Sequence, residues 1–81
     1  QFSYSTAEAR TEREAVRAGA SFLDAHPELL REAGVAANET QLAVLAVEIH
    51  DLFLVRDEET GRSAVVEPEP SVVRAVLAER R

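Results

Sequence analysis

The stretch that decides the fold is NETQLAVLAVEIHDLFLVRDEETGRSAVV, residues 38–66. On helical geometry of about 100° per residue, it has one broad apolar face, made of Leu42, Leu45, Ala46, Ile49 and Phe53. Its polar residues fall on a narrow stripe, made of Gln41, Glu48 and Asp51, with Val44 and Val55 inside it. A helix with so thin a polar stripe is usually covered by neighbours on most sides. We therefore predict a central, almost wholly buried helix over Asn38–Asp51.

The start of this helix carries a capping signal. Asn38 is a favoured N-cap residue, Gln41 stands three positions later, and Glu39 adds an acid to the first turn. A strand over Leu42–Ile49 is the competing interpretation, because periodicity alone does not separate short apolar runs. The cap, the alanines and the length of the run favour the helix.

Two short apolar runs after the helix predict a β-hairpin. Leu52–Val55 and Ser63–Val66 flank a polar turn that contains Gly61. Glycine takes a positive φ without steric cost, as many hairpin turns require. We expect the helix to give way to the first strand near Leu52.

Two further helices are predicted before the central one. Ser5 and Glu8 form a capping box, so the first helix should begin at Thr6. It should end by Ala25, because the residue before Pro27 is pushed out of the helical region. Small residues on its apolar stripe would let a neighbouring helix approach closely, namely Ala15, Gly19 and Ala20.

The second helix should be short and the last one should close the chain. Pro27 suits the first position of a helix over Pro27–Ala33, and Gly34 suits the left-handed position after it. Beyond the hairpin, a stiff segment at residues 68–70 leads to a helix whose buried side is Val72, Val73, Val76 and Leu77. The prediction is one small domain over residues 1–81, α+β and mainly helical. Its order is helix, short helix, central buried helix, β-hairpin and C-terminal helix.

Composition narrows the classes of partner. The chain has a net charge of −6, and its nine basic residues are all Arg. An acidic body repels phosphate backbones, so nucleic-acid binding is disfavoured. The absence of Lys excludes Schiff-base chemistry, and the absence of Cys excludes disulfides and thiolate metal sites. Abundant Ala, Val, Glu and Arg without Lys is associated with the genome of a GC-rich bacterium.

No catalytic, cofactor or metal site is predicted, so we expect that the chain is not an enzyme. Its serines lie in no nucleophile-elbow context, its glycines are isolated, and its two histidines have no metal-binding spacing. For His50, a core or helix-end position is favoured over a ligand or a general base. His26 precedes Pro27 and is interpreted as a cap of the second helix or as an exposed side chain.

About half of the chain resembles a winged-helix regulator of the MarR type. Glu28–Gly34, Asn38–His50 and Val55–Val66 are similar to the helix, helix and wing of such proteins. The resemblance implies a winged-helix-like arrangement, with the second of these helices reading DNA. Here that helix carries Gln41 and Glu48 and no Arg or Lys, so we assign no DNA-reading residue.

The predicted function is a non-catalytic protein–protein interaction or regulatory module, a small acidic domain of the cytoplasm. No apolar run approaches the ~20 residues of a membrane span. So small a core leaves apolar surface uncovered, which predicts a homodimer or a docking site for another protein. The expected contact residues are Phe2, Tyr4, Val44, Glu48, Asp51 and Val55. Two alternatives stay open: a winged-helix-type transcriptional regulator, and an acidic nucleic-acid-mimic inhibitor of phage type.

Overall fold

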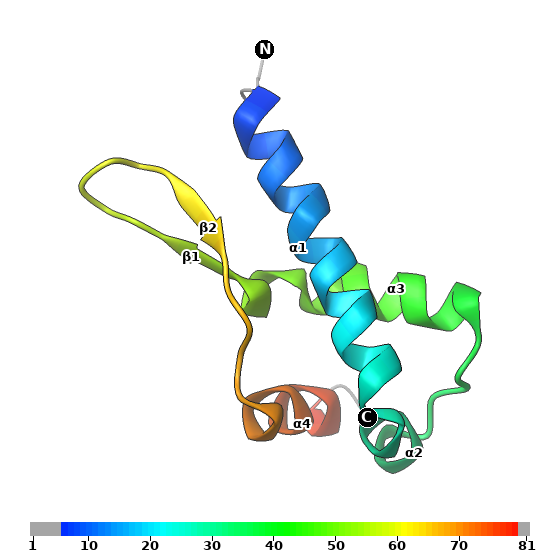
Figure 1. The fold of residues 1–81 in the computed structure, drawn as a ribbon. Coiled ribbons are helices and arrows are strands. Elements are labelled where there is room, and N and C mark those ends of the chain that lie inside the picture. The colour runs from blue at the N-terminus through cyan, green and yellow to red at the C-terminus, as the bar shows by residue number, and fades with distance from the viewer. Residues whose placement is uncertain (1–5, 80–81) are drawn as a thin grey trace.

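The computed structural model describes residues 6–79 as four α-helices, one 3-10 turn and a two-stranded antiparallel hairpin (Figure 1). In chain order these are α1 (Thr6–Ala25), α2 (Pro27–Ala33), α3 (Glu39–Ile49), η1 (His50–Phe53), β1 (Leu54–Arg56), β2 (Ser63–Val65) and α4 (Pro70–Glu79). The predicted fold class, mainly helical α+β, and the predicted order of elements are confirmed.

The long helix α1 crosses α3 at close range (Figure 1). Small side chains on the buried side of α1 make this crossing possible, because Ala15 is fully buried and Gly19 has no side chain. A Cβ atom at Gly19 would lie 3.6 Å from the Phe53 ring and 3.7 Å from the Ala46 Cβ. The prediction of a close helix contact through these small residues is confirmed.

One apolar core lies beneath this crossing. Every described helix and η1 contribute to it, through Ala15, Phe22, Leu23, Leu29, Leu30, Leu45, Ile49, Phe53, Val73 and Leu77. The rings of Phe22 and Phe53 meet edge to face with centroids 5.5 Å apart. That geometry suits the aromatic quadrupole and adds to the stabilisation from area burial.

Helix α3 begins as predicted and ends earlier than predicted. The side-chain oxygen of Asn38 accepts a hydrogen bond of 2.9 Å from the Gln41 backbone N–H. The α-helix stops at Ile49, and the tighter η1 turn carries the chain to Phe53. The Leu54 N–H then bonds to the Asp51 carbonyl, so the end of the turn is satisfied by a 3-10 type bond. The strand therefore starts at Leu54, two residues after the predicted boundary.

The prediction that α3 is almost wholly buried is wrong for its outer face. Leu45 and Ile49 are each 2% exposed, whereas Val44 is 51% and Val47 is 55% exposed. The reason is that α3 packs chiefly on α1 and on η1, while α2 packs on α4. One large neighbouring helix covers only one side of α3.

Helix α2 has the bounds that local sequence chemistry predicts. Gly34 adopts φ 72°, and its N–H bonds to the Arg31 carbonyl while the Val35 N–H bonds to the Leu30 carbonyl. This pair of bonds is a Schellman ending. His26 does not cap the helix with its side chain. Instead its ring stacks on Phe22, and its Nδ1 donates to the Phe22 carbonyl oxygen at 2.8 Å.

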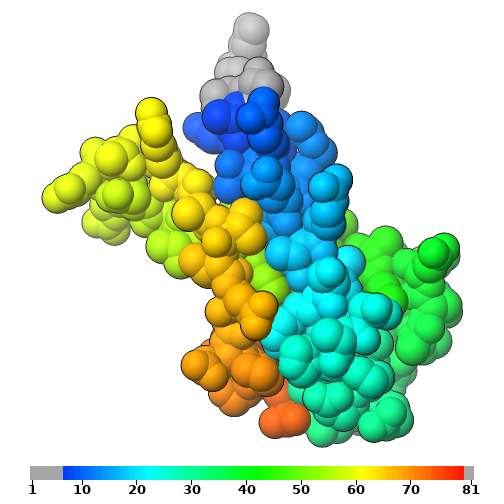
Figure 2. Space-filling view, viewed as in Figure 1, coloured from blue at the N-terminus to red at the C-terminus, as the bar shows by residue number. Residues whose placement is uncertain are grey.

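The hairpin extends away from the helical body (Figures 1 and 2). Val55 lies opposite Ala64 in the register of β1 and β2, and both are exposed. Gly61 adopts φ 73° in the turn, as predicted. Val55 therefore belongs to the first strand, as the hairpin prediction has it, and its other predicted place on the polar stripe of the central helix is wrong.

Helix α4 buries two of the four residues predicted for its inner side. Val73 and Leu77 are buried, Val76 is partly buried, and Val72 is 43% exposed. The Arg74 Nε donates to a carboxylate oxygen of Glu32 at 2.8 Å, which links α4 to α2. Both side chains are about half exposed, so the ion pair contributes at most about 1 kcal/mol.

Truncating the buried side of α3 should destabilise the fold. Leu45→Ala and Ile49→Ala should each cost about 2–5 kcal/mol, because each leaves a cavity beneath α1. The exposed Val44→Ala serves as a control and should change stability by less than about 0.5 kcal/mol. Urea unfolding followed by circular dichroism measures all three. A cost below about 1 kcal/mol for both core variants would contradict the central position of α3.

Substitutions at Gly19 should show how large a side chain the helix crossing can accept. Gly19→Ala adds one methyl at ordinary contact distances, and it should stabilise the fold by about 0.4–1 kcal/mol through backbone entropy. Gly19→Leu forces α1 and α3 apart and should cost at least about 1–3 kcal/mol. Thermal melts of both variants measure the difference. Equal stability of the two variants would refute a tight crossing.

Candidate interaction surface

The residues predicted for partner contact lie on three different elements or outside the described chain. Val44 and Glu48 lie one turn apart on the exposed side of α3, and Asp51 follows in η1. Val55 lies on β1, 53% exposed. Phe2 and Tyr4 lie outside the described residues. The structure thus brings together Val44 and Glu48, with Asp51 on the next turn, and puts Val55 on the hairpin.

The outer face of α3 carries a further apolar residue that the prediction did not assign to contact. Val47 is 55% exposed and stands three residues after Val44, so the two valines are neighbours on the helix surface. The signal was the helical spacing itself, because Ala43, Val44 and Val47 share one side of the helix. Val47 was not assigned to contact because the central helix was expected to be almost wholly buried.

An open hollow of about 440 Å³ lies between α1 and α3. It is lined by apolar residues of both helices, Val16 and Ala20 from α1 and Ala43 and Ala46 from α3, with Glu12, Arg13 and Arg17 beside them. Ala43 stands one turn before Val47. The hollow therefore continues into the exposed valines of α3.

The two sides of this apolar area carry opposite charges. Arg13 and Arg17 are exposed one turn apart on α1, and neither has an ion-pair partner within residues 6–79. On the α3 side, Glu48 is exposed beyond the valines, Asp51 follows in η1, and Glu39 is exposed one turn before Ala43. The Asp51 carboxylate lies 3.3 Å from the Nε2 of His50. The area is thus bordered by two exposed arginines along α1, with Glu12 beside them, and by carboxylates beyond the valines.

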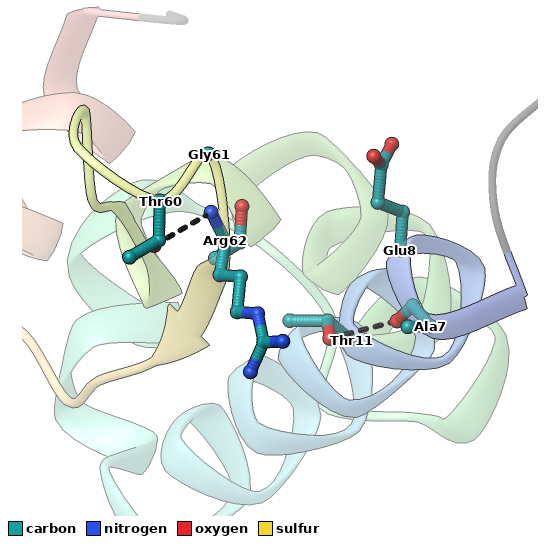
Figure 3. A pocket seen from close by; sticks show the side chains of 7 residues that line it. Ala7, Glu8, Thr11, Thr60, Gly61 and Arg62 are labelled. Atoms are coloured by element: carbon teal, nitrogen blue, oxygen red, sulfur yellow. Dashed lines mark hydrogen bonds between the residues drawn. The ribbon is translucent and has the colours of Figure 1, made fainter.

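A second hollow of about 510 Å³ lies between the start of α1 and the hairpin turn. Figure 3 shows side chains that line it from both sides, Ala7, Glu8 and Thr11 from α1 and Thr60, Gly61 and Arg62 from the hairpin. The Thr11 hydroxyl donates to the Ala7 carbonyl, and the Thr60 hydroxyl accepts from the Arg62 backbone N–H. Each hydroxyl thus forms a hydrogen bond with the backbone of its own segment, α1 or the hairpin turn.

The histidines have structural positions rather than a shared site. His50 ends α3, where its Nδ1 donates to the Val47 carbonyl at 2.7 Å. This position agrees with the helix-end alternative predicted for it. Across residues 6–79, no group of three His, Cys, Asp or Glu side chains is placed to hold a metal ion. Among the described helices, none combines the length and apolar character that a membrane crossing requires.

No protein-family model, curated protein or solved structure matches this chain. The similarity to winged-helix regulators therefore rests on the residue pattern alone.

Proposed function

We propose that this chain is a non-catalytic protein–protein interaction or regulatory module of the cytoplasm that self-associates as a homodimer. The observation that carries the proposal is the pair of half-exposed valines, Val44 and Val47, on the outer face of α3. Val47 stands one turn after Ala43, which lines the hollow shared with α1. Contiguous apolar surface with a charged rim is typical of protein contact sites.

The chemistry of α3 supports a protein partner over a DNA duplex. Its exposed charges are all acidic, including Glu39 and Glu48, and it carries no Arg. Arg13 and Arg17 border the hollow between α1 and α3, while Arg62 lines the separate hollow beside the hairpin. A major-groove surface needs several cationic side chains on one face.

A charge in the valine area should abolish partner binding. Val44→Glu should reduce bound protein at least about tenfold, because a carboxylate buried in an apolar contact has no partner there. The measurement is quantitative mass spectrometry of proteins captured from native cell extract by the tagged chain. Val72→Glu, on the exposed part of α4, is the matched control and should bind like the wild type. If Val44→Glu and the wild type capture the same proteins equally, α3 is not the binding face.

The isolated chain should not bind duplex DNA specifically. Repulsion between its acidic surface and the phosphate backbone opposes association, and α3 offers no cation to read a base. Fluorescence anisotropy with labelled random and genomic duplexes at physiological salt is the measurement. Salt-sensitive, sequence-specific binding below about 1 µM would reject the interaction module in favour of the transcriptional regulator.

A further inference from the structure

We infer that the dimer forms across a two-fold axis through the α1–α3 face, with the basic edge of each copy on the acidic edge of the other. The inference rests on the proposed function and specifies its partner and its geometry. The α1–α3 face is defined here as the apolar band Val16, Ala20, Ala43, Val44 and Val47, its basic edge Arg13 and Arg17, and its acidic edge Glu48 and Asp51.

The order of residues around α3 places the band between the two edges. Ala43 lines the hollow beside α1, and Val47 follows it one turn later on the same side. Successive residues differ by about 100° around the axis, so Val44 lies farther from α1 than Val47 does, and Glu48 farther still. Glu48 is therefore separated from Arg13 and Arg17 by the width of the band, and Asp51 follows it three residues later in η1.

A surface of this kind is complementary to itself. In an isologous dimer the same patch is used twice. A rotation of 180° about an axis that runs along the band places each edge of one copy opposite the other edge of its partner. Arg13 and Arg17 of one copy then face Glu48 and Asp51 of the other, and the same contacts form a second time. The apolar bands meet between them and lose their contact with water.

Charge also argues for a second copy over an unrelated acidic or basic segment. A segment of one sign would be attracted by one edge of the face and repelled by the other. Two copies of a chain with a net charge of −6 repel each other at long range. Only an orientation that brings opposite edges together offsets this repulsion locally, so the charges select the two-fold arrangement.

A charge exchange between the two edges tests the arrangement in the purified chain. Arg13→Glu with Arg17→Glu makes both edges acidic, and Glu48→Arg with Asp51→Arg makes both basic. Each double variant alone should dimerise at least about tenfold more weakly than the wild type, because like charges then face each other. An equimolar mixture should form a heterodimer within about threefold of the wild-type dissociation constant, because its edges are complementary again. Sedimentation equilibrium over a concentration series measures all four samples.

A matched control separates local pairing from total charge. Arg31→Glu with Arg62→Glu changes the net charge as much as the arginine variant does, at exposed positions on α2 and the hairpin. This control should dimerise within about threefold of the wild type. Circular dichroism of every variant verifies that the fold is kept, as expected for exposed residues.

Three outcomes overturn the inference. A wild-type chain that stays monomeric at high micromolar concentration excludes the second copy. Variants that dimerise like the wild type, or a mixture that fails to recover, exclude the pairing of these edges. If the wild-type chain is monomeric but still captures other proteins from extract in a Val44-dependent way, the interaction module stands and only its homodimeric form fails.

Discussion

The close crossing of α1 and α3 at Gly19 is the contact on which the rest of the structure depends. A Cβ there would already touch Phe53 and Ala46, so the helix axes are as near as a small residue allows. The crossing brings Leu45 and Ile49 against α1 and turns the outer side of α3 away from the core. The same contact that fixes the fold therefore also creates the exposed valine surface.

The core is thin because the chain is rich in small side chains, which also allow the close crossing. Fourteen alanines leave few large side chains to fill the space between helices. The helices consequently share one thin core, in which α1 packs chiefly on α3, and α2 packs on both α4 and α1. These contacts leave other sides of the helices uncovered, and the uncovered sides retain residues such as Val44 and Val72.

Local chemistry made much of the fold predictable from sequence. Pro27 and Gly34 set both ends of α2, and Asn38 set the start of α3, because caps and left-handed turns depend on a few adjacent atoms. The exposure of Val47 was not predictable in this way. Periodicity states which residues share a face, whereas burial depends on how many other elements cover that face.

The misplacement of Val55 and the role of His26 have similar causes. The sequence allowed Val55 a place on the helix as well as in the hairpin, because apolar runs look alike in a helix end and a strand. The α-helix ends at Ile49, which leaves Val55 in the strand. His26 bonds back to α1 through Phe22, a contact that depends on the angle between α1 and α2. The candidate surface was thus partly predictable: Val44 and Glu48 of α3 were assigned and Val47 was missed, while the residues of α1 required the crossing.

The ion pair between α2 and α4 joins residues that are 42 positions apart in the chain. While the chain leaves the ribosome, α1 and α2 emerge well before α4 does. Leu29 of α2 borders the same hollow as Leu77 of α4, so its native neighbour is missing until nearly the whole domain has been made. The nascent chain consequently exposes the apolar side of α2 to water until α4 has been made and can cover it.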